Sequence, residues 1–187
     1  MTLANIMKLA LRQLDEAAED IAEYDELFRS YANMGYMIAL RLFLRPRETF
    51  ELTTDAQGRA DISALPVMRV VDMLNAQGRP VRFSLSADGR TIVTEEKDAA
   101  VRALCEVERP ALEADTDEPE LPQYAHPALA DYICYRHLSS GNLAKQSRAQ
   151  HYRNEFYAQM QRLSPRPSGG VTGYKNFYTV TDSRWMM

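Results

Sequence analysis

The sequence of 187 residues lacks the patterns by which catalytic and metal sites are commonly recognised. It has only three histidines, His126, His137 and His151, and their spacing matches no zinc-binding pattern. It contains no glycine loop of the kind that cradles phosphates and no GxSxG nucleophile motif. Its acidic residues are scattered or lie in connecting segments, so they give no sign of acid–base chemistry. We therefore expect no catalytic residue, no metal site and no cofactor.

Cysteines and long apolar runs are scarce as well. The two cysteines, Cys105 and Cys134, lie far apart among apolar residues, which predicts buried free thiols in a reducing compartment. No apolar run approaches the roughly 20 residues that span a membrane, and the N-terminus lacks the layout of a signal peptide. The net charge of −4 argues against general nucleic-acid binding. A chain that is 45% hydrophobic and 26% charged is instead typical of one globular intracellular domain.

Apolar residues at helical spacing predict two helices in the first 44 residues. The first apolar stripe consists of Leu3, Ile6, Met7, Ala10, Leu11 and Leu14. The second helix should cover about residues 21–44 and end before Pro46, since proline disfavours a helical conformation in the preceding residue. Its stripe is expected at Tyr24, Leu27, Phe28, Tyr31, Met34, Ile38 and Leu42. Gly35 costs a helix up to about 1 kcal/mol relative to alanine, which suggests close packing against another helix.

From residue 48 to residue 108 the apolar pattern alternates, which predicts a β-rich insert. The expected strands cover residues 48–53, 67–73, 81–85, 91–94 and 101–107, with turns at 55–58 and 75–78. Asp88-Gly89 is the clearest hairpin turn. Residues 99–106 are compatible with either a strand or a helix. Together these elements predict a small antiparallel sheet with one face packed inward and the other in water.

Residues 113–122 (EADTDEPELP) predict an exposed acidic linker that leads to a helical hairpin over residues 126–163. Residues 139–142 (SSGN) end one helix and can cap the next. The second helix places Tyr152, Phe156, Met160 and Leu163 on one face and Lys145, Arg148, Arg153 and Glu155 on the other. Two helices joined by so short a turn pack antiparallel or at a steep angle.

The C-terminal residues 164–187 predict a flexible tail, because SPRPSGG at residues 164–170 cannot hold a packed element. Four aromatic residues follow: Tyr174, Phe177, Tyr178 and Trp185. A disordered tail usually lacks aromatic residues. They are therefore candidate partner-binding residues of a segment that orders on a partner, or they fold back on their own domain. The sequence leaves both open.

The order of these parts and several short stretches resemble the head–tail adaptor, or connector, proteins of tailed bacteriophages. In that family an N-terminal helix pair precedes a β-rich insert, an acidic proline-bearing linker and a C-terminal helical hairpin. The first pair matches at residues 10–14 (ALRQL) and 31–36 (YANMGY). Residues 126–136 (HPALADYICYR) look like the family's H-x-A-L-x-D-Y-x-x-Y-R opening of its penultimate helix. The likeness covers roughly residues 3–163, and the chain departs from the family in its large β insert.

The resemblance implies a structural virion protein of the neck region, without enzymatic activity, assembled in the cytoplasm of the bacterial host. Members form a ring, expected to be a dodecamer, beneath the portal at the head's exit channel. The implied partners are the portal protein, a tail-side neck or tail protein, and further copies of the chain. Packaged DNA would pass through the channel without sequence-specific binding, and no membrane is involved. The tails of the family commonly run along or into the portal, which suits the aromatic segment here.

The predicted fold is therefore α+β, mainly α: a helical bundle, made of an N-terminal helix pair and a C-terminal helical hairpin, with an inserted small antiparallel β-sheet. Residues 1–163 would form the adaptor domain. The expected function is to join the portal vertex of a phage head to the tail. The alternative is a helix-turn-helix DNA-binding regulator, in which Lys145, Arg148 and Arg153 contact phosphates. An enzyme with an unrecognised site is a third reading, which a deep pocket holding perturbed titratable groups would favour.

Overall fold

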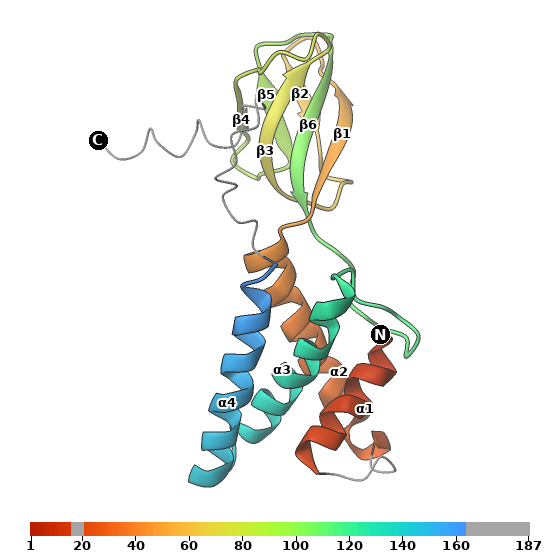
Figure 1. The fold of residues 1–187 in the computed structure, drawn as a ribbon. Coiled ribbons are helices and arrows are strands. Elements are labelled where there is room, and N and C mark those ends of the chain that lie inside the picture. Colours follow the sequence, from red (N-terminus) through yellow and green to blue (C-terminus); the bar gives the residue numbers. More distant parts are fainter. Residues whose placement is uncertain (16–20, 164–187) are drawn as a thin grey trace, which may run out of the picture.

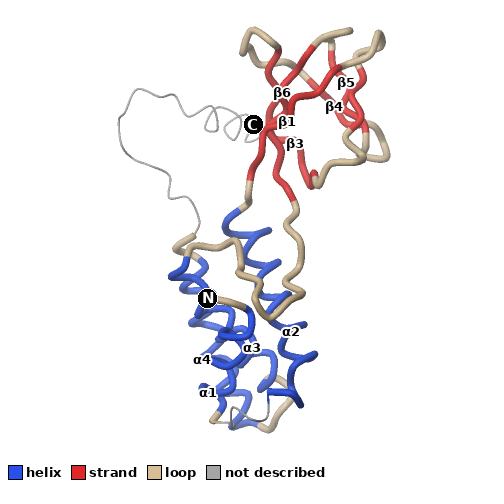
Figure 2. The backbone as a smooth tube through the Cα atoms, turned by 90° about the vertical axis from the view of Figure 1, so that its right-hand side faces the viewer, coloured by secondary structure: helices blue, strands red, loops and turns tan. Residues whose placement is uncertain are grey.

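The computed structural model describes residues 1–15 and 21–163, which form a helical bundle and a β module joined at a narrow waist (Figure 1). Residues 16–20 and 164–187 lie outside the described part. The chain crosses the waist twice, entering the β module before its first strand and returning after its last (Figure 2). This arrangement confirms the expected α+β fold with an antiparallel insert. No helix of the described residues is both long and apolar enough to cross a membrane.

The bundle is organised around one central helix. Its elements are α1 (Leu3–Leu14), α2 (Ile21–Ile38), the π-helical extension η2 (Ala39–Leu44), the short η3 (Gln123–Ala125), α3 (His126–Leu138) and α4 (Leu143–Met160). α3 packs against α1, α2 and α4. It is consequently buried nearly all round, at Ala128, Leu129, Ala130, Asp131, Tyr132, Ile133 and Cys134. The predicted hairpin is confirmed, and the side chain of Asn142 caps α4 by accepting a 3.1 Å hydrogen bond from the amide of Lys145.

The buried face of α2 differs from the predicted stripe. Leu27, Met34 and Leu42 were expected to face the core, but they are 43%, 44% and 57% exposed. Of the predicted stripe, Phe28 is buried as expected, and Tyr24, Tyr31 and Ile38 are partly buried against the core. The other buried positions on α2 and η2 are Ala32, Gly35, Tyr36, Ala39 and Leu40. Small residues on this face let α2 approach its neighbours closely, which gives dense packing. This packing stabilises the bundle more than burial of the bulkier side chains on the adjoining face would. α2 is thus apolar on two sides, of which only one is covered.

The β module consists of two three-stranded antiparallel sheets, where the sequence predicted one. One sheet has the order β1 (Arg47–Thr53), β6 (Ala100–Val107), β3 (Val67–Asn75), and the other has β2 (Arg59–Asp61), β5 (Thr91–Thr94), β4 (Phe83–Leu85). Side chains of both sheets share a core that includes Val70, Met73, Ile92, Val101 and Ala103. Residues 100–107 form the strand β6, so the helical alternative for residues 99–106 is wrong. The sequence missed β2, because a strand of three residues with one buried position, Ala60, is too short to show an alternating pattern.

Two turns of the β module repeat one local design. Asp55 and Asn75 each accept backbone hydrogen bonds from the amides two and four residues ahead, over 2.8–3.1 Å. The glycines that follow, Gly58 and Gly78, both have φ of +75°, a conformation that favours glycine. The predicted turns at 55–58 and 75–78 are therefore confirmed, with the acceptor side chain and the glycine each supplying a part of the geometry.

The acidic segment 113–122 is mostly exposed, yet it is tied to the bundle at several points. The first amides of α1, on Leu3 and Ala4, donate to the carbonyls of Asp117 (2.8 Å) and Asp115 (3.1 Å). Helix-terminal amides have no partner within the helix, so the segment satisfies them. Leu121, at its end, is buried in the bundle core, as is Leu112 just before it. The segment therefore connects the β module to α3 along a defined path.

Candidate interaction surfaces

The residues of α3 that carry the resemblance are the ones that hold the bundle together. His126, at its start, is 2% exposed. Its Nδ1 accepts a 2.7 Å hydrogen bond from the amino group of Met1, and its Nε2 lies 2.8 Å from the carbonyl oxygen of Leu121. Nε2 then carries the ring proton and donates it to that carbonyl. This histidine acts as a structural bridge between α1, the acidic segment and α3.

Asp131 is a buried carboxylate in the middle of α3, 6% exposed. Its two oxygens accept hydrogen bonds from Gln13 of α1 (3.0 Å) and Gln159 of α4 (3.1 Å). Burial raises the pKa of Asp131 to about 6, and the hydrogen bond from Gln13 offsets part of that effect. Asp131 was not among the residues predicted to be important, although it is the only charged residue in the run from Ala128 to Cys134. It links the three helices α1, α3 and α4.

Two stretches that are distant in the sequence, residues 31–36 and 126–136, meet in the bundle. The ring of Tyr132 fills the space over Gly35, where an added Cβ would lie 2.9 Å from the ring. The guanidinium of Arg136 lies over the ring of Tyr31, 5.6 Å from its centroid. The close packing expected at Gly35 is therefore confirmed. Both matching stretches form one contact surface between α2 and α3.

The cysteines and histidines occupy separate structural positions. Cys105 lies in the β module and Cys134 in α3, both fully buried, and burial raises their pKa to about 11 and about 12. They are buried free thiols, as predicted. The ring of His137 packs edge-on against Tyr24 and Phe28. Within the described ranges, no group of three or more metal-ligating side chains comes together.

The basic residues of α4 do not form one free surface. Arg148 donates from Nη2 to the backbone carbonyl of Gln13 (3.2 Å) and to Asp15 (3.3 Å), both at the C-terminal end of α1. Arg153 lies over the ring of Tyr157, 5.7 Å from its centroid. Lys145 is exposed in the first turn of α4. Of the three residues proposed to contact phosphates, two are therefore engaged within the bundle.

Ion pairs hold the two modules together at the waist. Arg41 of η2 lies 2.5 Å from Glu108, which follows β6. Arg109 pairs with Glu48 of β1 (2.5 Å) and with Glu120 of the acidic segment (2.9 Å). These pairs are partly exposed, so each contributes about 0–1 kcal/mol. Their arrangement fixes the direction of the β module more than it stabilises the fold.

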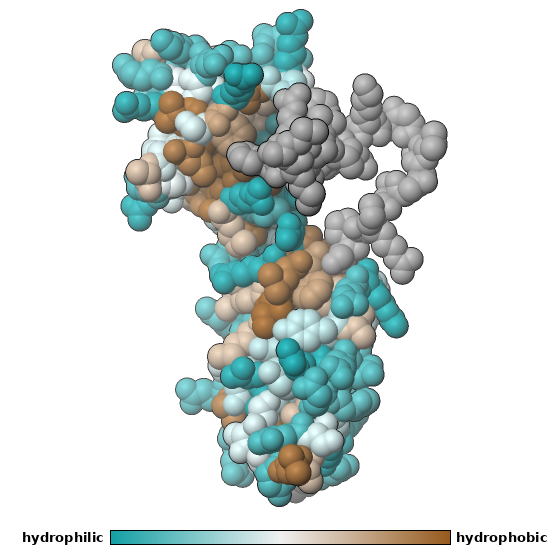
Figure 3. Space-filling view, turned by 90° about the vertical axis from the view of Figure 1, so that its left-hand side faces the viewer, coloured by the Kyte–Doolittle hydropathy of each residue, from teal (hydrophilic) through white to brown (hydrophobic). Residues whose placement is uncertain are grey.

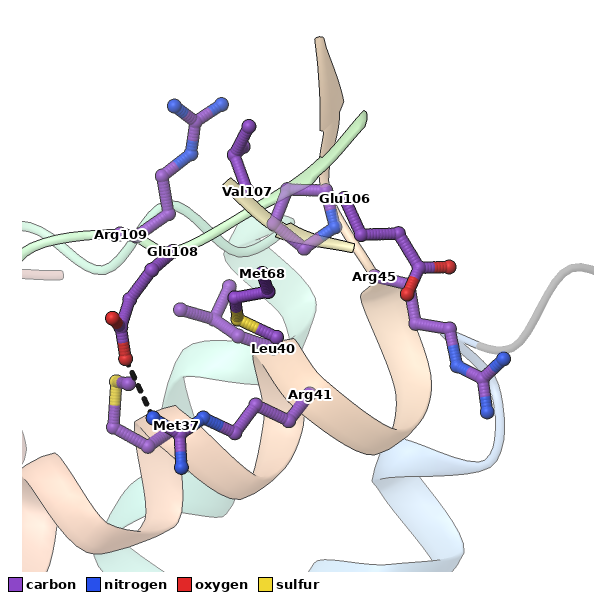
Figure 4. A pocket seen from close by; sticks show the side chains of 10 residues that line it. Met37, Leu40, Arg41, Arg45, Met68, Glu106, Val107, Glu108 and Arg109 are labelled. Atoms are coloured by element: carbon purple, nitrogen blue, oxygen red, sulfur yellow. Dashed lines mark hydrogen bonds and ion pairs between the residues drawn. The ribbon is translucent and has the colours of Figure 1, made fainter. Parts of the chain in front are cut away.

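A cavity lies between these pairs, where η2 meets the ends of β3 and β6 (Figure 4). Met37, Leu40 and Met68 line its apolar side, and Glu106 and Arg45 stand at its edge. Its volume is about 10 Å³, room for about one water molecule. Small-molecule sites measure about 300–1,000 Å³. This cavity is therefore a packing defect of the joint and not a ligand pocket.

A larger surface feature lies on the outside of the waist, which we call the waist groove. It is an open groove of about 640 Å³ lined by Leu42, Phe43, Leu44, Arg45, Pro46, Arg47 and Arg109. The space-filling view shows an apolar patch at the waist, between the hydrophilic surface of the bundle and the β module (Figure 3). Phe43 also packs against Tyr157 of α4, with ring centroids 6.2 Å apart. The waist groove therefore lies beside the end of α4.

The exposed side of α2 runs toward the waist groove. We call the line formed by Leu27, Tyr31, Met34, Ile38 and Leu42 the outer stripe of α2. Leu27, Met34 and Leu42 are exposed, and Tyr31 and Ile38 are half-buried. Sequence reasoning found this set but assigned it to the core, and only the packing of Gly35 against Tyr132 shows which face is covered. The predicted partner-binding residues Tyr174, Phe177, Tyr178 and Trp185 lie outside the described residues.

A scan against protein-family models found no match to this chain, and a search of curated proteins found no significant match.

Proposed function

We propose that this protein is a head–tail adaptor of a tailed bacteriophage: a structural, non-enzymatic virion protein that joins the portal vertex to the tail. Its copies would form a ring beneath the portal and contribute to the DNA exit channel. Packaged DNA would pass through the ring without sequence-specific binding. A neck or tail protein would bind the opposite side. The C-terminal residues 164–187 would reach the portal.

The observation that carries the proposal is the position of the resembling residues. His126, Asp131 and Tyr132 lie in α3, and each bridges α3 to another part of the bundle. The stretch around Gly35 packs directly on Tyr132. Matching residues that are buried and hold the bundle together support a shared fold more strongly than a match of surface residues does. Fold by itself leaves function open, so an experiment must test the assembly.

The exposed apolar residues support a role in assembly. Met68 and Leu85 on the β module are 44% and 43% exposed, and Leu143 at the turn between α3 and α4 is 83% exposed. A ring needs two different patches on each subunit that contact each other in a head-to-tail manner. The β module and the far end of the bundle offer such patches on separate parts of the molecule.

The test is co-assembly with the portal encoded by the same genome. Purified protein mixed with portal particles should add a ring of density beneath the portal in electron micrographs. Replacing Tyr174, Phe177, Tyr178 and Trp185 by serine keeps the length of the tail but removes its aromatic groups. This variant should lose attachment, whereas replacing Thr172, Thr179 and Thr181 by serine should not.

Two results would contradict the proposal. Failure of the unaltered protein to bind its own portal would exclude the adaptor role. Retained attachment after deletion of residues 164–187 would exclude the tail as the portal-binding segment. A salt-dependent affinity for duplex DNA that is lost on Lys145→Ala with Arg148→Ala would favour a DNA-binding regulator instead.

A further inference from the structure

We infer that the aromatic segment of residues 171–187 docks on its own chain, in the waist groove and along the outer stripe of α2. Three features of the described residues support this: an uncovered apolar helix face, a groove continuous with it, and the place where the described chain ends. Docking of this kind does not depend on whether the partner of the protein is a portal.

The outer stripe is the first feature. The exposed sides of a surface helix usually carry polar and charged residues, because only one face packs against the core. Instead, Leu27 and Met34 of α2 and Leu42 of its extension η2 lie on an exposed side, in line with the half-buried Tyr31 and Ile38. From Leu27 to Leu42 the line is roughly 22 Å long at 1.5 Å per residue. Isolated exposed leucines are ordinary, but a continuous apolar line indicates a surface that something covers.

The waist groove is the second feature, and Leu42 belongs to it as well as to the stripe. Its volume of about 640 Å³ is sufficient for aromatic side chains. Its lining combines Leu42, Phe43 and Leu44 with arginines at the rim. Arginine lies over aromatic rings readily, and the bundle already shows that contact between Arg136 and Tyr31. The surface therefore suits a segment rich in tyrosine, phenylalanine and tryptophan.

The end of the described chain is the third feature. Leu163 is 8% exposed and packs in the bundle core after α4. Tyr157, six residues earlier, contacts Phe43, so the chain leaves the bundle beside the waist groove. The spacer of residues 164–170 reaches at most roughly 25 Å when fully extended. That reach delivers residues 171–187 to the groove and the stripe.

The same geometry favours the chain's own segment over a second copy. A spacer of only seven residues, 164–170, gives the tethered segment an effective concentration in the millimolar range. A second copy would have to bind from solution against that internal competitor. The segment contains Tyr174, Phe177, Tyr178 and Trp185, whose aromatic side chains supply an apolar surface that can cover the stripe. Any partner that binds residues 171–187 must therefore compete with the waist groove for them.

Trp185 is the only tryptophan of the chain, so its fluorescence reports on the segment alone. In the full-length protein its emission should be blue-shifted and its quenching by acrylamide weaker than in a synthetic peptide of residues 164–187. Leu42→Glu combined with Met34→Glu should move both readings toward those of the peptide, by about a tenfold shift in the ratio of docked to free segment (1.4 kcal/mol). Both positions are exposed, and an unchanged circular dichroism spectrum would show that the variant folds.

Leu143→Glu is the matched control, because Leu143 is even more exposed and lies at the other end of α4. It should leave the fluorescence of Trp185 unchanged. Three results would overturn the inference: emission equal to that of the peptide in the unaltered protein, no effect of the paired Glu variant, or an equal effect of the control. Protection of Trp185 that is lost on dilution would show that the occupant is another copy and would overturn the assignment to the same chain.

Portal attachment is a separate readout, so the two ideas can fail independently. The paired Glu variant would free the segment and should bind the portal at least as well as the unaltered protein. If Trp185 is protected in the unaltered protein and exposed in the paired Glu variant, but neither protein binds the portal, the docking inference stands and only the adaptor role is contradicted.

Discussion

Gly35 and Tyr132 set the distance between α2 and α3. The ring of Tyr132 occupies the space that a side chain at position 35 would need, with 2.9 Å from an ideal Cβ to Cγ. Phe156 of α4 also lies close, with its ring centroid 4.9 Å from that of Tyr132. The ring of Tyr132 therefore contacts both α2 and α4.

Gly35→Ala should destabilise the protein, although alanine is the better helix former. The gain in helix propensity is about 1 kcal/mol, whereas overpacking of a tight core costs typically about 1–3 kcal/mol. The ring of Tyr132 has little room to move, because the residue is only 4% exposed and its ring also packs against Phe156. We expect a net loss of about 1 kcal/mol or more in urea unfolding.

Ser30→Ala provides the matched control for Gly35→Ala, because Ser30 lies on the same helix and is exposed. It should be neutral or slightly stabilising, as alanine is the better helix former at both sites. If Gly35→Ala were as stable as Ser30→Ala, the contact between Gly35 and Tyr132 would not limit the packing of the bundle.

Gly58 and Gly78 have the same φ of +75° in the same type of turn, but their surroundings differ. A Cβ added at Gly78 would make an ordinary contact, 3.7 Å from the guanidinium of Arg102. A Cβ added at Gly58 would instead clash with the backbone oxygen of Thr94. Gly78→Ala should cost about 1–2 kcal/mol, the strain of a left-handed conformation. Gly58→Ala should cost more by about 1–3 kcal/mol, because a backbone oxygen cannot move aside.

The two alanine variants control for each other, since the local sequences DAQGR and NAQGR are nearly identical. Thermal unfolding should place Gly58→Ala clearly below Gly78→Ala. Equal destabilisation would mean that the strained φ alone determines the cost and that the strand contact beside Gly58 relaxes freely.

Asp131 should make the stability of the bundle depend on pH. Burial raises its pKa to about 6, above the ordinary 3.8. The folded state therefore binds the proton more tightly than the unfolded state, so this contribution is fully present below about pH 4 and is lost as the pH rises through about 6. The difference corresponds to about 3 kcal/mol. Asp131→Asn removes the ionisation while keeping one acceptor for Gln13 or Gln159.

Asp131→Asn should therefore gain stability relative to the unaltered protein at pH 7.5, and this advantage should shrink toward pH 4. Urea unfolding at pH 7.5 and pH 4 measures this difference in unfolding free energy. The control is Glu51→Gln at an exposed position of β1, which should have the same small effect on stability at both pH values. A loss of stability by Asp131→Asn that is equal at both pH values would show that its hydrogen bonds, and not its ionisation, determine its contribution.

The sequence predicts the element order because period and turn chemistry are local properties. The helical stripe from Leu3 to Leu14, the turn at Asp88-Gly89 and the cap at Asn142 each depend on neighbouring residues only. The face of α2 that is covered depends on Tyr132, about a hundred residues away, which no local pattern reveals. The division of the strands into two sheets likewise depends on pairings such as β2 with β5, far apart in the chain.

The candidate surfaces were predicted less well than the fold. All four predicted partner-binding residues, Tyr174, Phe177, Tyr178 and Trp185, lie outside the described part of the chain, so they remain predictions. The outer stripe of α2 was visible in the sequence, but a stripe of apolar residues predicts a core face by default. Its exposure follows only once small residues such as Ala32 and Gly35 are seen to fill the core side.

Both cysteines should be unreactive in the folded protein. The thiolate is the reactive form, and burial raises the pKa of Cys105 to about 11 and that of Cys134 to about 12. Both side chains are also fully buried, so a reagent in solution cannot reach them in the folded protein. Labelling by a disulfide reagent at pH 8 should therefore proceed only as fast as the β module or the bundle opens.

Single-cysteine variants separate the two modules: Cys134→Ala leaves Cys105 to report on the β module, and Cys105→Ala leaves Cys134 to report on the bundle. Ser139→Cys, at an exposed position after α3, is the control and should label at once. Rapid labelling of Cys134 without denaturant would mean that α1 and α3 separate easily.

Asn33 of α2 should hold the start of the acidic segment through a pair of hydrogen bonds. Its Nδ2 donates to the carbonyl of Leu112 (2.9 Å), and its Oδ1 accepts from the amide of the same residue (2.7 Å). Asn33→Asp replaces the donor by an acceptor facing that carbonyl, which should cost about 1–3 kcal/mol locally. Hydrogen exchange at the amide of Leu112 should then accelerate by at least tenfold.

Asn154→Asp, on the exposed side of α4, should leave that rate unchanged. An unchanged rate in Asn33→Asp would mean that burial of Leu112 alone holds the segment.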